Sequence, residues 1–231
     1  MNADLAVVDD GPDTASMTAD VEVDATLAVT DVGPDVAAIA AVAKRNKLPL
    51  HLDGARLANA LASTGATAAE MIQKTGVDVV SFGGTKNGLM GVEAVIMFNP
   101  ENSWEFELRR KRSGHLMSKH RYLSAQMQAY LTDDLWLKSA TIANERAAEL
   151  GQGLSDIDSV ELCHPVQANM VFAKFSRARH RAAIQAGATY YFAPFDTSIE
   201  GDDNEILTAR MVCSWSTTST EIDQLLALIS A

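Results

Sequence analysis

The sequence has few cysteines: Cys163 and Cys213 are the only two among 231 residues, and they form no C-x-x-C pair. Two scattered cysteines are more typical of reduced thiols than of a disulfide. No apolar run is long enough to span a bilayer, and the N-terminus lacks the basic and apolar regions of a secretory signal. We therefore expect a cytoplasmic protein with no membrane partner, and we predict no metal site.

Basic residues are absent from the first 35 positions, which hold nine of the 30 acidic residues. Without these nine, 21 acids face 19 Lys and Arg, so the formal charge of −11 belongs mostly to this stretch. No basic face is evident elsewhere, and we predict no nucleic-acid partner. Residues 1–32 therefore read as an acidic N-terminal stretch, for which short strands and a loosely ordered tail both stay open.

From Gly33 onward the apolar pattern indicates an α/β fold. Residues 33–47 and 67–76 are typical of helices, because the first begins near a proline and the second has a capping-box pair, Thr67 and Glu70. The apolar runs 48–53, 77–82 and 92–98 predict buried strands. Since strands and helices alternate, we expect a mainly parallel sheet with right-handed crossovers.

The second half of the chain changes character. Residues 101–150 read as helical, with breaks near Ser113-Gly114 and Thr132. After Gly151 and Gly153, short strand-like and helix-like segments mix, which indicates a smaller α+β domain. We predict that the acidic stretch 1–32 is followed by the remainder of a large domain at 33–130. A linking helix and small domain would then occupy 131–231.

Two residues at predicted strand ends carry the functional argument. Asp53 closes the strand in "LHLDGARLANAL", and Lys86 follows the next strand in "SFGGTKNGLMG". Neighbouring parallel strands would bring both to one edge of the sheet, where ligands bind in such folds. Pyridoxal 5′-phosphate (PLP) needs an amine for its aldehyde and a carboxylate for its ring nitrogen. Taken singly, a helix-capping aspartate and a solvated lysine are the commoner interpretations.

These motifs also resemble those of a known family. "HLDGARLANAL" and "SFGGTKNGLMGVEAVIMFNPE", with "SGHLMSKHRYLSAQM" and "ARMVCSWSTT", are similar to the low-specificity L-threonine aldolases, β-eliminating lyases among the fold-type I PLP enzymes. The similarity runs from about Gly33 to the C-terminus. It implies an α/β fold of the PLP-dependent transferase type, with a truncated large domain and a C-terminal α+β small domain.

The resemblance implies roles for four residues. Lys86 matches the Schiff-base lysine, and Asp53 matches the partner of the pyridinium nitrogen. Arg56 matches an arginine near the cofactor that helps to hold the substrate carboxylate. Arg210 matches the small-domain arginine that clamps the same carboxylate, and two planar donor groups would fix its orientation.

Two further cations lie in "KRSGHLMSKHR". Lys119 and Arg121 are candidates for the cofactor phosphate, either in the same subunit or in a neighbouring subunit of a homo-oligomer (a dimer or tetramer), while a solvated helix face is an equal alternative. His51 lies two residues before Asp53, so both share a strand face. It is expected either to support Asp53 or simply to pack in the core.

The implied reaction is cleavage of a β-hydroxy-α-amino acid such as threonine or allo-threonine into glycine and an aldehyde. The family's early phosphate cradle and stacking histidine have no counterpart in residues 1–32. Two alternatives therefore stay open. The chain could be a non-catalytic remnant or a subunit completed by another chain, or it could be another PLP-dependent lyase or aminotransferase.

Overall fold

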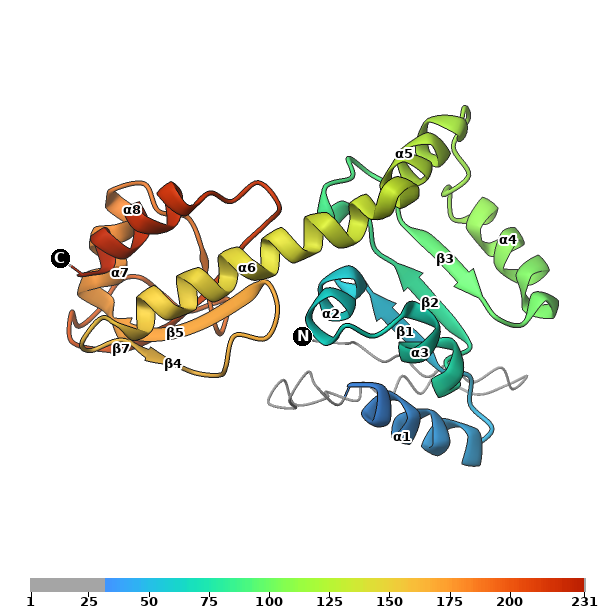
Figure 1. Ribbon diagram of the computed structural model, residues 1–231, viewed down its shortest axis with the longest axis horizontal. Helices are drawn as coiled ribbons and strands as arrows, with labels where there is room; N and C mark the ends of the chain where they lie inside the picture. Colours follow the sequence, from blue (N-terminus) through green and yellow to red (C-terminus); the bar gives the residue numbers. More distant parts are fainter. Residues whose placement is uncertain (1–31, 231) are drawn as a thin grey trace. The chain divides into compact units, whose positions relative to one another are not determined.

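The structure is a computed structural model, and it describes residues 32–230. The predictions for residues 1–31 lie outside this range. The chain divides into two compact units, one ending at Lys138 and the other beginning at Ser139 (Figure 1). Among the helices of residues 32–230, none combines the length and apolarity that a bilayer crossing requires.

The first unit holds a three-stranded sheet in the order β1-β2-β3, with helices before, between and after its strands (Figure 1). The strands are β1 (His51–Gly54), β2 (Val79–Phe82) and β3 (Ala94–Met97). The helices are α1 (Val32–Arg45), α2 (Leu57–Thr64), α3 (Ala68–Met71), α4 (Ser103–Arg112), α5 (Arg121–Leu131) and α6 (Leu135–Ser155), which continues into the second unit. Short 3₁₀ turns occupy Gln73–Thr75, Thr85–Asn87, Pro100–Asn102 and Thr132–Asp134.

Alternation along β1 and β2 gives this sheet one apolar face and one polar face. Leu52, Val80 and Phe82 are buried in a cluster with side chains of α1, α2 and α3. The intervening residues of the two strands are only partly buried, Asp53 and Ser81 among them. This is the period-2 pattern of a strand, and it places His51, Asp53 and Ser81 on the face opposite the core.

The prediction of a mainly parallel sheet is only partly correct. β1 and β2 are parallel, with Asp53 opposite Ser81, whereas β3 runs antiparallel to β2 and pairs Val79 with Met97. The physical reason lies in the connections. Residues 55–78 contain helices that can cross over, but residues 83–93 contain only one 3₁₀ turn. A parallel pair needs a crossover of a dozen or more residues, so the shorter link returns antiparallel.

Several local predictions are confirmed. Thr67 and Glu70 form a reciprocal capping box at the start of α3. Gly76 ends the following turn with φ of 99°, a left-handed conformation that favours glycine. The expected helix breaks also appear, because α4 ends at Arg112 and α5 ends at Leu131.

The second unit holds an antiparallel four-stranded sheet in the order β4-β5-β7-β6. Its strands are β4 (Glu161–Leu162), β5 (Met170–Ser176), β6 (Tyr191–Phe192) and β7 (Ile206–Val212). Besides the later part of α6, its helices are α7 (Arg177–Gln185) and α8 (Ser219–Ser230). Alternate residues of β5 and β7, such as Phe175 and Ala209, are buried in a core that also takes Leu154 of α6 and Ile229 of α8.

Candidate active site

Asp53 lies near the C-terminal end of β1 on the polar face of the sheet. Its Oδ1 accepts a hydrogen bond of 2.9 Å from the Ala55 N–H, so the side chain also shapes the turn that leaves the strand. The side chain is half-buried. A carboxylate in this position is fixed by its own backbone, and it is oriented before any ligand arrives.

His51 belongs to the same polar face. Its Nε2 lies 2.7 Å from Ser81 Oγ on the neighbouring strand. Burial lowers the pKa of His51, and the negative charge of Asp53 opposes that shift. The predicted shared face with Asp53 is confirmed, and a supporting role for His51 stays a prediction.

Lys86 lies in the 3₁₀ turn Thr85–Asn87, directly after β2, and its side chain is exposed. The loop that carries it rests on the turn after β1. The Gly83 N–H donates to the Gly54 carbonyl at 3.1 Å, and a Cβ on Gly83 would lie 2.5 Å from the Ala55 carbonyl oxygen. The structure thus brings the Lys86 loop and the Asp53 turn together at one sheet edge.

Arg56 is placed in the same turn. It precedes α2 with φ of −126°, and its side chain is half-buried. Because Gly83 packs on the backbone of the adjacent Ala55, Arg56 belongs to the neighbourhood in which the Asp53 turn and the Lys86 loop meet. Three of the predicted residues are therefore grouped by two adjacent backbone segments.

Arg121 is the first residue of α5 and Lys119 lies two residues before it, and both side chains are exposed. Lys119 has a positive φ of 61°. The Arg121 guanidinium lies over the ring of its neighbour Tyr122, with its Cζ 5.0 Å from the ring centroid. Their assignment to a phosphate stays a prediction.

Arg210 belongs to the second unit, where it lies on β7 opposite Phe172 of β5 and Tyr191 of β6. Its Cζ is 5.5 Å from the ring centroid of Phe195, a cation–π geometry. Its Nη2 lies 3.5 Å from the Met170 sulfur. Arg210 also lines a cavity of about 720 Å³ with parts of β7, α8 and residues 186–191.

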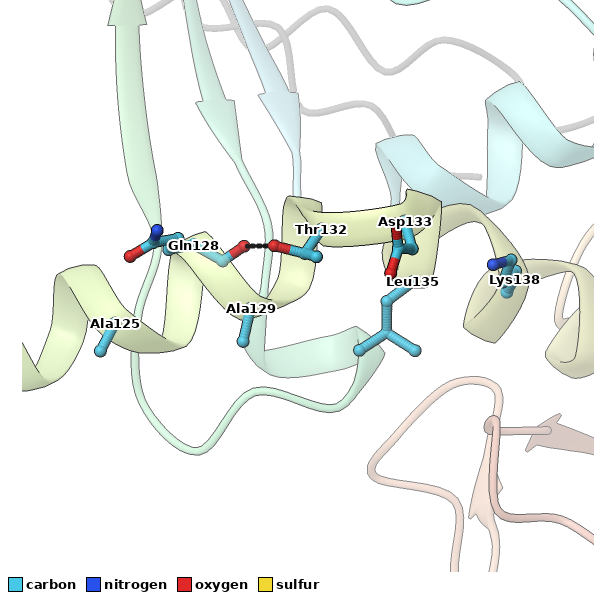
Figure 2. Close-up of a pocket in the computed structure, with 7 residues that line it drawn as sticks. All are labelled: Ala125, Gln128, Ala129, Thr132, Asp133, Leu135 and Lys138. Atoms are coloured by element: carbon cyan, nitrogen blue, oxygen red, sulfur yellow. Dashed lines mark hydrogen bonds between the residues drawn. The ribbon is translucent and has the colours of Figure 1, made fainter.

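A second hollow, of about 530 Å³, lies where α5 meets α6 (Figure 2). Residues of the helix junction line it, Gln128 and Thr132 among them. The Thr132 hydroxyl donates a hydrogen bond of 2.8 Å to the Gln128 carbonyl. The complete lining is Ala125, Gln128, Ala129, Thr132, Asp133, Leu135 and Lys138. None of the predicted site residues is among these, so we assign no catalytic role to this hollow.

Three polar side chains around Lys86 are absent from the sequence-based predictions. They are Asn87 in the same turn, Glu93 just before β3, and Tyr130 near the end of α5. Asn87 follows the lysine directly, so its place in the "GGTKNG" turn was a local signal. Glu93 and Tyr130 reach the loop from 8–9 and 43–47 positions away, and spacing of that kind carries no local pattern.

Comparison with known proteins gives this geometry a family. The model of the beta-eliminating lyase family matches residues 33–177. The chain belongs to the beta-eliminating lyase family. The predicted membership of the β-eliminating lyases is therefore confirmed, and the relatives below confirm the resemblance to threonine aldolases.

Individual relatives of this lyase-family chain are similar over most of its length. It is 41% identical over 193 residues to a low-specificity L-threonine aldolase from a Pseudomonas species, covering 84% of this chain and 53% of that protein. A protein of the same name from Pseudomonas aeruginosa is 40% identical over 179 residues and is covered to 49%. The chain thus spans about half the length of the curated relatives it matches.

Solved structures agree on the fold. A threonine aldolase from Leishmania major superposes with a TM-score of 0.74 at 26% identity, covering 85% of this chain and 55% of that one. A putative L-allo-threonine aldolase from Listeria monocytogenes superposes with a TM-score of 0.64 at 17% identity, covering 85% and 55%. The expected fold class is confirmed for the overall α/β fold, but not for a mainly parallel sheet.

Proposed function

We propose that this chain carries the lysine–carboxylate part of a PLP-dependent lyase. The enzyme would cleave small β-hydroxy-α-amino acids of the threonine or allo-threonine type to glycine and an aldehyde. The contact between the Lys86 loop and the turn of Asp53 and Arg56 is the observation that carries the proposal. The low-specificity L-threonine aldolases among the relatives support the choice of substrate class.

The residues at this edge fit the groups that PLP requires. Lys86 offers an exposed primary amine for the cofactor aldehyde. Asp53 offers a half-buried carboxylate whose Oδ1 is fixed by the Ala55 N–H. Gly83 has no side chain where any Cβ would strike Ala55, so the loop can approach the turn closely. Amine and carboxylate are therefore supplied by adjacent segments, as the cofactor chemistry demands.

The cofactor, when bound, supplies an electron sink for the carbanion left when a bond to Cα breaks. Lys86 would hold it covalently, and Asp53 would keep its ring nitrogen protonated. In the overall reaction the Cα–Cβ bond breaks, the β-hydroxyl proton leaves with formation of the aldehyde, and Cα takes up a proton to give glycine. Asp53 would favour the negative charge that develops, because its own charge keeps the ring cationic.

The substrate carboxylate is assigned to arginine side chains. Arg56 and Arg210 would each offer planar N–H pairs, which fix the carboxylate in one orientation and so select which bond to Cα is cleaved. Lys119 and Arg121 would bind the cofactor phosphate in a homo-oligomer. Light scattering of the purified chain tests this part, because a strict monomer would contradict a role that depends on a neighbouring subunit.

The decisive experiment is a PLP titration followed by borohydride reduction and peptide mapping. We expect a visible absorbance band and a pyridoxyl label at Lys86, and Lys86→Ala should abolish both. Release of aldehyde from threonine, measured with the same sample, tests the reaction itself. Absence of the band, or a band that persists in Lys86→Ala, would refute the cofactor assignment.

Two controls separate the alternatives. Consumption of a keto-acid acceptor in place of aldehyde release would indicate an aminotransferase. A label at Lys86 without turnover of threonine or phenylserine would favour a cofactor-binding but non-catalytic chain.

A further inference from the structure

The buried side chain of Tyr130 forms hydrogen bonds at both ends of the loop that carries Lys86, to Gly83 and to Asn87. Asn87, next to the lysine, is 5% exposed. Its Nδ2 donates to the Tyr130 hydroxyl at 2.6 Å and to the Trp136 carbonyl at 2.8 Å. The two protons of that amide nitrogen are therefore both used.

Tyr130 also bonds the residue that precedes the loop. Its hydroxyl donates to the Gly83 carbonyl at 3.3 Å while it accepts from Asn87. The ring is 1% exposed and packs 5.9 Å from the ring of Phe82. Burial raises the pKa of Tyr130, so the hydroxyl keeps the proton that it donates to Gly83. One side chain thus joins the residues that precede and follow the 84–86 segment.

Glu93 holds the loop from the outside. Its Oε2 accepts from the Gly84 N–H at 3.2 Å, and its Oε1 accepts from the Thr85 N–H at 3.0 Å and from the Thr85 hydroxyl. An ionised carboxylate only accepts hydrogen bonds, so it matches this group of three donors. The two peptide N–H groups immediately before Lys86 are fixed by this contact.

The approach of Glu93 depends on a glycine. A Cβ on Gly84 would lie 2.6 Å from Leu89 Cδ1 and 2.7 Å from the Val92 carbonyl oxygen. Only the absence of that Cβ lets the 88–92 segment fold back against the loop and deliver the carboxylate next in sequence. Both glycines before Thr85 are therefore required for steric reasons. Gly83 makes room for Ala55, and Gly84 makes room for Leu89 and Val92.

We infer that Glu93 and Tyr130 are positioning residues that hold the Lys86 backbone so that its amine is presented to the cofactor. The inference rests on the proposed function, because it concerns the reactivity of Lys86 toward PLP. A lysine has a flexible stem, and an exposed short loop would add backbone freedom to it. Contacts at residues 83, 84, 85 and 87 remove that freedom and leave only the side chain to be ordered.

The test measures the reactivity of one lysine against others in the same molecule. Glu93→Gln and Tyr130→Phe are titrated with PLP, reduced with borohydride and mapped, and the Lys86 label is divided by the labels on the exposed Lys44 and Lys138. Glu93→Gln keeps the size but faces the donors with an amide group. Tyr130→Phe keeps the ring and removes the hydroxyl. We expect each to weaken PLP attachment at Lys86 by about tenfold, the scale for losing hydrogen bonds of this kind.

Matched controls use side chains outside the loop. Glu107→Gln changes an exposed carboxylate of α4, and Tyr122→Phe removes an exposed hydroxyl of α5. Both should leave the Lys86 ratio unchanged. Thr85→Val removes the hydroxyl contact but keeps both backbone contacts of Glu93, so its effect should be smaller than that of Glu93→Gln. Melting temperatures are measured for every variant.

The outcomes separate the two proposals. If the unaltered chain labels Lys86 no more than Lys44, the proposed function fails. If it labels Lys86 preferentially and folded Glu93→Gln retains the same ratio, the positioning role is refuted while the proposed function stands. If Tyr130→Phe changes all lysine labels in parallel, Tyr130 acts through core stability and not through Lys86. A selective loss at Lys86 with normal melting of Glu93→Gln supports the inference.

Discussion

The backbones of Gly83 and Ala55 lie in direct contact. A Cβ on Gly83 would lie 2.5 Å from the Ala55 carbonyl oxygen and 2.6 Å from its Cα. Real Cβ atoms do not approach backbone atoms so closely, so only glycine fits here. This contact joins the end of β1 and the turn after it, which hold Asp53 and Arg56, to the segment after β2, which holds Lys86.

Gly83→Ala tests that contact. The added methyl group must push the two backbone segments apart, and we expect a loss of about 1–3 kcal/mol in the free energy of unfolding. The measurement is urea unfolding followed by circular dichroism, with the PLP absorbance band recorded alongside. Gly91→Ala is the matched control, because a Cβ there meets no atom within 4 Å. Equal stability of the two variants would contradict the steric argument.

The meeting of Asp53 and Lys86 at one sheet edge could be predicted because it depends on short-range signals. Apolar runs mark β1 and β2, the helical segments between them allow a right-handed crossover, and the parallel pairing predicted from this order is the one in the structure. The direction of β3 depended instead on the length of the link before it. Its apolar pattern is the same for either direction, so periodicity alone could not reveal the antiparallel pairing.

The contacts of Glu93 and Tyr130 with the Lys86 loop could not be predicted from the sequence, for a different reason. Glu93 and Tyr130 act on the loop through hydrogen bonds whose partners are distant in sequence, and a tyrosine within an amphipathic helix reads as an ordinary core residue. Arg210 was assigned through a family motif, and its strand partners in the second unit are known only from the fold.

Asp53→Asn should separate the electrostatic role of this residue from its structural role. The asparagine oxygen can still accept from the Ala55 N–H, so the turn should persist and the melting temperature should change little. Loss of the charge should lower kcat for threonine cleavage by about 100-fold or more, the scale for removing a group that stabilises developing charge.

The control for this variant is Asp78→Asn. Asp78 precedes β2, and its Oδ2 accepts from the Leu50 N–H at 2.8 Å, so it is a carboxylate at the opposite end of the strand pair. Its neutralisation should leave kcat nearly unchanged. Full activity of Asp53→Asn would show that the charge of Asp53 is not needed.

Arg210→Lys tests recognition of the substrate carboxylate. A lysine keeps the positive charge but loses the planar pair of N–H donors, and it stacks less well on Phe195. We expect KM for threonine to rise by about tenfold, with a smaller change in kcat. Arg109→Lys, on the exposed surface of α4, is the control. An unchanged KM would remove Arg210 from the substrate site.

The last prediction concerns His180, which is fully buried in the second unit. Its ring stacks on Phe175 with 3.7 Å between centroids. Its Nε2 lies 3.2 Å from the Leu207 carbonyl, and its Nδ1 lies 3.0 Å from the Tyr190 hydroxyl. Because a carbonyl can only accept, Nε2 carries the proton and Nδ1 accepts from Tyr190. The neutral ring therefore has a hydrogen-bond partner at each nitrogen.

Burial lowers the pKa of His180 from 6.5 to about 4. The unfolded chain then binds more protons than the folded chain between these values, so the stabilisation is complete above pH 6.5 and is lost as the pH falls toward 4. The loss amounts to about 3 kcal/mol. His180→Phe keeps a ring against Phe175 but cannot titrate, so its free energy of unfolding should fall less between pH 6.5 and 4. Urea unfolding across this range, with His164→Gln as the control, measures the difference. Parallel curves for His180→Phe and the unaltered chain would show that His180 does not cause the acid sensitivity.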